Sequence, residues 1–435
     1  MHNLRKFTLL LSLALFASTT LACATEKAAP VSAKAIWGDR AEGKGYKIQD
    51  KVETEGVYRL YVLETRIGSF SITSDALLSL RLDEYAAFER LMDDSGFAHF
   101  VGSFGSSAIA PLKFGGQLLT SPVETAKRSA TGIGNFFDQL SSSGENKDPE
   151  RGSFMGGVLG TDSGRREVAA QVGVDPYTDF PPLVNRLQEL AAARGMGGLS
   201  VSGAMMAIPG GSALPSMTAT GTRTAVYTAS SVGKAQALQD ELRSKTAGQI
   251  MRDSRMKLSA LAGPKAVDAI MNNKIFTPSD ILVIAIALEQ IKARNTDAFL
   301  MRCAAVSDRT GAYLRRRQAE MYAGLHTTLP IERFFEASGY MVAQLKDKRA
   351  LVAMPADHIF WTERNRDDVA RLRESLAKLM PDIPRGKPGE PNKMMVITGD
   401  YSPMAKTELS KQMWEAARMT LTSDTPPASE PQQQP

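Results

Sequence analysis

Residues 277–288 read TPSDILVIAIAL, and this stretch decides the fold class. Thr277 is a typical helix N-cap, Pro278 suits the first helical position, and Asp280 places negative charge at the positive end of the helix. The apolar residues that follow predict one buried helical face, made of Ile281, Leu282, Ile284, Ala285 and Leu288. With a second helix expected over about 297–325, the region 226–337 is predicted to be a helical domain.

Three adjacent arginines, Arg315, Arg316 and Arg317, lie in the second half of that longer helix. Successive helical positions point in different directions, so the three side chains cannot form a concentrated phosphate cradle. We expect a solvated face, with Glu320 nearby. Cys303, in the first half, is expected to be a small buried hydrophobic residue.

Two short apolar runs follow the helical domain, ALVAM at 350–354 and MMVI at 394–397. Both are candidates for buried strands. One helix is expected between them, over about 367–380, and another from Ser402 to about Met419. The order strand–helix–strand–helix suggests a small α/β unit over 338–421. The Pro-, Ser- and Gln-rich tail, 422–435, is expected to be disordered.

The N-terminal side of the helical domain has a different pattern. Residues 45–73 alternate apolar and polar side chains between glycines, which predicts an antiparallel meander. Ser74 then caps a predicted helix over 75–92, giving a β-meander plus helix at 25–94. A Gly-rich, weakly apolar segment fills 95–225. The fold class is therefore predicted to be α+β and predominantly α-helical.

The first 24 residues predict export. Arg5 and Lys6 precede the apolar run FTLLLSLALF, and the small residues Ala22-Cys23-Ala24 resemble a cleavage site. The apolar run is shorter than the roughly 20 residues that span a bilayer. We therefore expect a signal peptide over 1–24 and a periplasmic or secreted protein. The alternative is lipid anchoring at Cys23.

Composition narrows the function classes. The 435 residues carry a formal charge of +5, and removal of Arg5 and Lys6 lowers it by two, to +3. So small an excess implies no nucleic-acid partner. The two cysteines exclude a disulfide scaffold and any multi-cysteine metal site. No motif indicates a cofactor or a resident metal.

The sequence is uncharged between Arg194 and Arg223. Gly203, Ala207 and Gly211 recur at every fourth position, which would give a helix a small-residue stripe for close packing. Met205 and Met206 flank that stripe. These five residues are the candidates for contact with a membrane or a partner; the alternative is a Gly-rich segment buried in protein.

Ser231 and Lys234 match the S-x-x-K pair of serine acyl-enzymes, in which the lysine takes the proton of the nucleophile. Ser254 with Lys257 and Ser375 with Lys378 match equally well, and the companion motifs S-x-N and K-T-G are absent. An exposed helical Ser/Lys pair is therefore the alternative interpretation.

A second candidate constellation follows the two C-terminal strands. Asp357 and His358 come after the first of them and Asp400 after the second. Because ligands gather at the carboxyl ends of strands in open α/β sheets, these groups are candidates to hold a cation or activate water. The alternative is that both acids shape turns and cap helices.

These observations favour an exported, non-catalytic bacterial envelope protein whose partners are envelope proteins or a membrane surface. The alternative is a periplasmic hydrolase, acting through Ser231 and Lys234 or with a metal at Asp357, His358 and Asp400.

Overall fold

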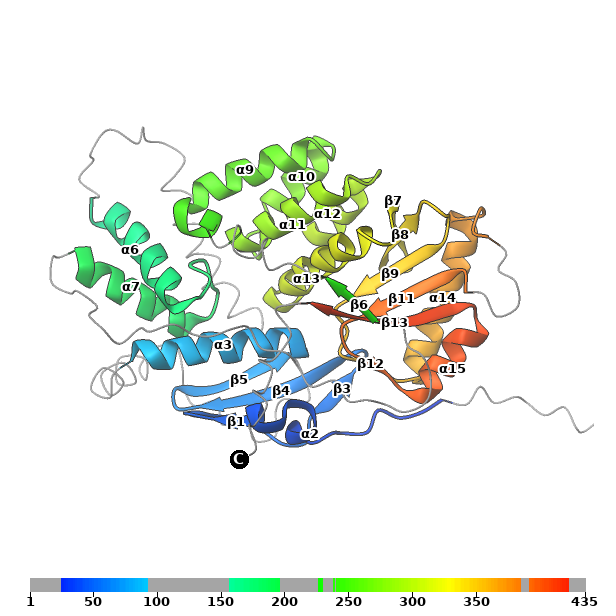
Figure 1. Ribbon diagram of the computed structural model, residues 1–435, viewed down its shortest axis with the longest axis horizontal. Coiled ribbons are helices and arrows are strands. Elements are labelled where there is room, and N and C mark those ends of the chain that lie inside the picture. The colour runs from blue at the N-terminus through cyan, green and yellow to red at the C-terminus, as the bar shows by residue number, and fades with distance from the viewer. Residues whose placement is uncertain are drawn as a thin grey trace, which may run out of the picture.

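The computed structural model describes residues 25–92, 156–195, 226–229, 238, 240–384 and 391–421. Helices and sheets occur in the same chain, so the predicted α+β class is confirmed. Three large parts are visible in Figure 1. A sheet with its covering helices is at the right, a smaller antiparallel sheet (β1–β5) lies below, and a helical hairpin (α6 and α7) is at the left.

The larger sheet has six strands in the order β6-β13-β11-β9-β8-β7. These are Val226–Ala229 (β6), Ile331–Ala337 (β7), Tyr340–Leu345 (β8), Ala350–Met354 (β9), Lys393–Ile397 (β11) and Trp414–Leu421 (β13). β6, β13, β11 and β9 run parallel, whereas β8 and β7 are antiparallel additions. Both predicted strands, 350–354 and 394–397, are confirmed, and the sheet takes strands from both sides of residue 337.

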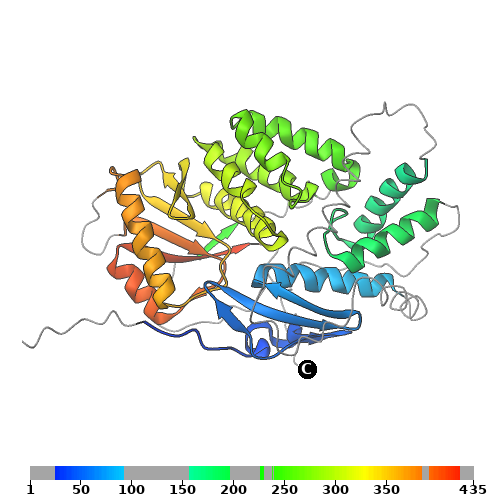
Figure 2. The same ribbon diagram turned by 180° about the vertical axis from the view of Figure 1, so that it is seen from behind.

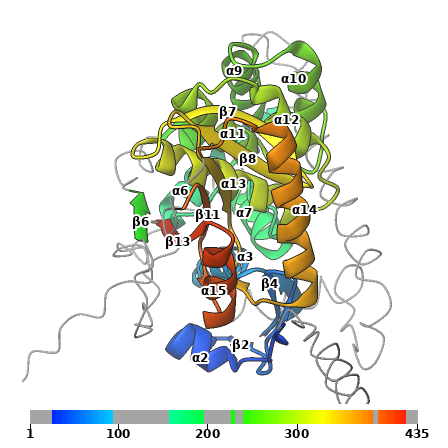
Figure 3. The same cartoon turned by 90° about the vertical axis from the view of Figure 1, so that its right-hand side faces the viewer.

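Helices cover both faces of this sheet. Helices α14 (Glu363–Leu379) and α15 (Pro403–Lys411) pack on one face, and α13 (Arg309–His326) lies on the other (Figure 3). Because both faces are covered, the central strands β9 and β11 are buried throughout.

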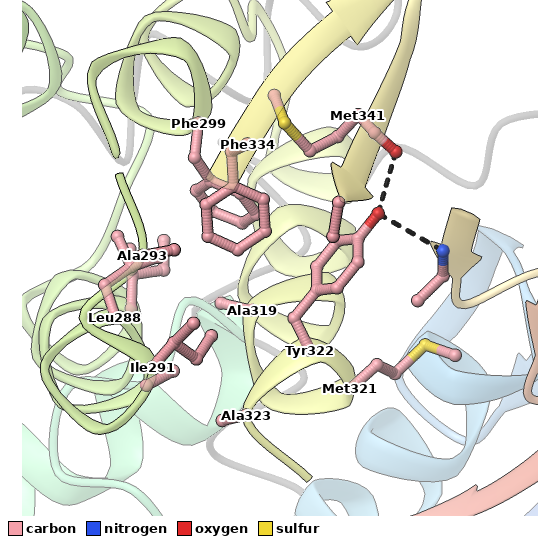
Figure 4. Close-up of a cluster of buried hydrophobic side chains, with 14 of the residues drawn as sticks. Leu288, Ile291, Ala293, Phe299, Ala319, Met321, Tyr322, Ala323, Phe334 and Met341 are labelled. Carbon is pink, nitrogen blue, oxygen red and sulfur yellow. Dashed lines mark hydrogen bonds between the residues drawn. The ribbon is translucent and has the colours of Figure 1, made fainter. Parts of the chain in front are cut away.

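Tyr322 fixes α13 to the sheet. Its hydroxyl donates to the carbonyl of Met341 (2.7 Å) and accepts the N–H of Ala353 (3.2 Å), as Figure 4 shows. Its ring meets that of Phe334 edge-on at 5.2 Å, beside Phe299. A buried tyrosine with both a packed ring and a satisfied hydroxyl holds one orientation.

The helical part before the sheet contains α9 (Ala247–Ser259), α10 (Pro264–Met271), α11 (Pro278–Ile291) and α12 (Thr296–Ala304). The predicted start of α11 is confirmed: Thr277 Oγ1 accepts the N–H of Asp280, and Asp280 Oδ2 accepts the N–H of Thr277. Cys303 is fully buried, as expected, and burial raises the pKa of its thiol to about 12.

Two predictions for the following residues are wrong. The single helix expected over about 297–325 is two helices, α12 and α13, because Asp308 caps a new start by accepting the N–H of Gly311 (2.8 Å). The three arginines are not a solvated face either, since Arg317 is buried and Arg316 pairs with both Glu320 and Asp280.

The C-terminal prediction is also partly wrong. The helix expected from Ser402 to about Met419 ends at Lys411, and the chain continues as β13. Met413 adopts a left-handed backbone conformation with φ at 65°, which breaks the helix. β13 then pairs in parallel with β11 and β6, so sheet pairing overrides its helix-forming residues.

The N-terminal part is the predicted antiparallel meander with one helix. Its elements are α2 (Ala33–Trp37), the 3-10 turn Gly38–Ala41, β1 (Glu42–Gly43), β2 (Tyr46–Ile48), β3 (Glu53–Glu55), β4 (Tyr58–Thr65), β5 (Gly68–Thr73) and α3 (Asp75–Leu91). β4 pairs with β2, β3 and β5, and α3 packs along the sheet. Ser74 caps α3, as predicted. Figure 2 shows the meander from behind.

Helices α6 (Gly156–Val172) and α7 (Pro181–Gly195) form an antiparallel hairpin against α3. A Cβ on Gly164 would lie 3.3 Å from the backbone of Ala191, so the two helices approach closely there. We call α3, α6 and α7 the three-helix unit, since they share one apolar cluster.

Candidate functional site

The structure brings Asp357, His358 and Asp400 together at the carboxyl ends of β9 and β11. Two short strands, β10 (His358–Ile359) and β12 (Asp400–Tyr401), pair in parallel there, with His358 opposite Asp400. The strand order therefore gathers these residues at one edge of the sheet, as we expected from the sequence.

Asp357 connects the end of β9 to the N-terminal meander and its helix through hydrogen bonds. It is 1% exposed, and its two carboxylate oxygens accept the backbone N–H groups of Arg59 (2.7 Å) and Asp75 (2.9 Å). These groups lie on β4 and at the first residue of α3. Burial and the neighbouring Asp75 raise the pKa of Asp357 well above its usual range.

Sequence reasoning missed Arg59, Tyr61 and Asp75, which complete this cluster. Asp75 forms an ion pair with Arg59 and accepts the hydroxyl hydrogen of Tyr61 at 2.5 Å. Ser74, beside them, is buried and held at a φ of 86°, an uncommon angle for a residue other than glycine. One feature of the sequence could have indicated this cluster. Arg59 is two positions before Tyr61 in a half-buried strand, so a charged side chain lies on the face that points inward.

Asp400 is more accessible than Asp357. Its carboxylate lies 3.5 Å from Lys406 Nζ and 3.5 Å from Arg418 Nη1, and Oδ1 accepts the N–H of its neighbour Tyr401. Two cations balance this acid, so its charge is compensated without a ligand.

His358 stacks on Phe360 with the ring centroids 4.2 Å apart. Burial lowers its pKa to about 4; Arg59 and Lys406 add to the shift, and Asp400 and Glu26 oppose it. The imidazole is therefore neutral at pH 7, and a proton is held more weakly in the folded chain than in the unfolded chain.

This shift predicts acid sensitivity. The unfolded chain takes up the proton near pH 6.5 and the folded chain only near pH 4, so His358 should reduce stability as pH falls between those values, by about 3 kcal/mol at most. Urea unfolding at pH 7 and pH 4.5 measures it. His358→Gln should lose less free energy of unfolding on acidification than the unchanged protein. An equal loss in both proteins would contradict the assignment.

Other predicted site residues lie outside the described chain. These are Ser231 and Lys234, the membrane or partner candidates Gly203, Met205, Met206, Ala207 and Gly211, and Cys23. Both competing S-x-x-K matches are described. In the first, Ser254 is buried and Lys257 forms an ion pair with Glu289 at 2.7 Å. In the second, the hydroxyl of Ser375 lies 2.6 Å from that of Ser338.

Within the described residues, no three His, Cys, Asp or Glu side chains are placed to hold a metal ion together. The same residues contain no helix with the length and apolarity needed to cross a membrane. Compared with protein families, with curated proteins and with solved structures, the chain matches none of them.

The geometry of this edge favours a structural role for Asp357. Both of its oxygens accept backbone N–H groups and the side chain is 1% exposed, so the carboxyl group connects β4 and α3 to the end of β9 and is shielded from water. The described part of the site thus joins the meander to the α/β unit.

Proposed function

We propose that this is an exported, non-catalytic envelope protein that contacts a membrane surface or other envelope proteins through its Gly-rich segment, 95–225. The observation that carries the proposal is the attachment of that segment. The segment contains α6 and α7, and its two parts outside the described residues, 95–155 and 196–225, are each continuous in sequence with one of these helices.

The three-helix unit is held together by packing and hydrogen bonds, so the segment extends from a well-ordered part of the protein. Residue 92 follows α3, residue 156 begins α6, and residue 195 ends α7. The side chain of Arg186 on α7 donates twice to the carbonyl of Leu91, at 2.8 and 3.0 Å, and so locks the end of α3 to the hairpin. Because α6 and α7 are antiparallel, the start of one and the end of the other lie at the same end of the hairpin.

Membrane fractionation tests the proposal. The full chain should sediment with membranes, and Met205→Glu with Met206→Glu should release most of it, because two charges in an apolar contact cost several kcal/mol. Met256→Glu is the matched control, since Met256 is 66% exposed on α9 and should have no role in attachment. A mature protein wholly soluble without salt or detergent would count against membrane contact and leave protein partners, which crosslinking in cells would detect.

A hydrolase is the second candidate, and the observation behind it is that His358 and Asp400 lie opposite each other on the paired strands β10 and β12. Labelling by a serine-reactive probe that disappears in Ser231→Ala would support the acyl-enzyme form. Stoichiometric metal that is lost in His358→Gln would support the metal-assisted form. Negative results in both experiments end this candidate.

A further inference from the structure

Arg315 lies beyond the carboxyl end of β9. Three residues later on α13, the side chain of Gln318 donates to the carbonyl of Ala353 (2.6 Å), and Tyr322 accepts the N–H of the same residue. Helix α13 therefore runs along β9, with its earlier turns toward the end of the strand where Asp357 and His358 follow. Arg315, one turn before Gln318, is placed at that end.

Tyr58 reaches the same place from the meander. The carbonyl of its neighbour Val57 accepts the N–H groups of Asp357 (2.9 Å) and His358 (3.2 Å), which fixes the start of β4 against the end of β9. Burial raises the pKa of the Tyr58 hydroxyl to about 12, Asp357 adds to this, and Arg315 opposes it. Tyr58 on β4 and Arg315 on α13 are thus both placed at the carboxyl end of β9.

Arg315 differs from the other arginines of α13. Arg309, Arg316 and Arg317 each form an ion pair with a carboxylate. Arg315 is half-buried, yet within the described chain its one hydrogen bond goes to the neutral Oε1 of Gln318 at 2.5 Å.

The surroundings of Arg315 disfavour the charged form of its guanidinium group. Burial lowers its pKa, and Arg302, at the end of α12, lowers it further as a like charge. Removing a guanidinium from water without an acidic partner destabilises a protein. Such a cost is typical of groups kept for binding.

We propose that Arg315 and Tyr58 bind an oxyanion, the phosphate or carboxylate group of a small ligand, at the carboxyl end of β9. A guanidinium donates two parallel hydrogen bonds to such a group, and a tyrosine hydroxyl donates a third. Arg302 is not part of this site, since its Nη1 lies 3.7 Å from Oε1 of Glu336 and its Nη2 donates to the carbonyl of Gly339. The site is independent of the Gly-rich segment, so it goes beyond the proposed function.

Titration of the full chain with inorganic phosphate and with succinate, at constant ionic strength, tests the inference. Calorimetry should show one saturable site for at least one of the two anions, and the tighter one identifies the ligand group. Arg315→Met should weaken that binding at least tenfold, and Tyr58→Phe a few-fold. The matched control is Arg373→Met, since Arg373 is exposed on α14 and lies away from this edge.

A thermal melt of the same variants separates binding from a structural role. Arg315→Met removes an uncompensated charge and keeps the apolar stem, so its melting temperature without ligand should equal or exceed that of the unchanged chain. Arg315→Lys should fold but bind the anion weakly, because a lysine keeps the positive charge and cannot donate the two parallel hydrogen bonds of a guanidinium group. Absence of saturable binding, equal binding by Arg315→Met, or a lower melting temperature in Arg315→Met would each overturn the proposal.

Discussion

Gly399→Ala is expected to destabilise the protein by more than about 4 kcal/mol, enough to prevent folding in many domains. A Cβ at this position would lie 1.8 Å from the carbonyl oxygen of Asp357 and 2.4 Å from its carbonyl carbon. Both are backbone atoms, which cannot rotate away. The N–H of Gly399 donates to Ala356 and that of Asp400 to Asp357, so the two segments are held together from both sides.

Expression yield, circular dichroism and urea unfolding measure this effect. Gly248→Ala is the matched control, because Gly248 lies in the first turn of α9 and its added Cβ would meet nothing closer than 3.6 Å, the end of the Arg252 side chain. That change should be neutral or stabilise by up to about 1 kcal/mol. If Gly399→Ala is as stable as Gly248→Ala, the close contact between the β9 and β11 ends is not as described.

The sequence predicted elements whose signals are local. Thr277, Ser74 and Ser402 cap the helices that follow them because each cap is made by residues three positions apart. The helix expected to reach Met419 fails for the opposite reason. Residues 414–421 favour a helix on their own, and only β11 and β6, distant in sequence, make them a strand.

In the candidate site, too, local features were predictable from the sequence and long-range contacts were not. The meeting of Asp357, His358 and Asp400 was predictable, since parallel strands end at one edge. The partners of Asp357 were not, because Arg59 and Asp75 are 298 and 282 residues away. Nothing in the spacing of these residues indicates the contact, which arises only when the meander packs under the larger sheet.

A second group of buried charges holds the three-helix unit to the helical part. Asp179, 5% exposed, lies just before α7, and its Oδ2 accepts from Arg81 on α3 and from Arg309 on α13, each at 2.8 Å. Arg309 also pairs with Asp280 at 2.6 Å. Burial raises the pKa of Asp179, but Arg309 and Arg81 outweigh it and hold the pKa below its usual range.

Asp179→Ala is therefore expected to lower the free energy of unfolding by about 3 to 5 kcal/mol, because it leaves Arg81 without one of its two acids in a buried site. Urea unfolding at pH 7 measures the loss. Asp268→Ala is the matched control: its partner Arg255 and Asp268 itself are about half exposed, so the loss there should stay below about 1 kcal/mol.

A further variant distinguishes whether the ion pairs of Asp179 stabilise the protein or mainly orient the three-helix unit. Removal of one acid leaves charge behind, whereas removal of Arg81 together with both of its acids does not. The triple variant Asp179→Leu, Arg81→Met and Glu84→Gln should therefore recover part of the stability lost in Asp179→Ala. Recovery would indicate that the charges orient the three-helix unit more than they stabilise it. If Asp179→Ala costs no more than Asp268→Ala, the apolar cluster shared by α3, α6 and α7 holds the unit in place, and the base proposed for the Gly-rich segment depends on packing alone.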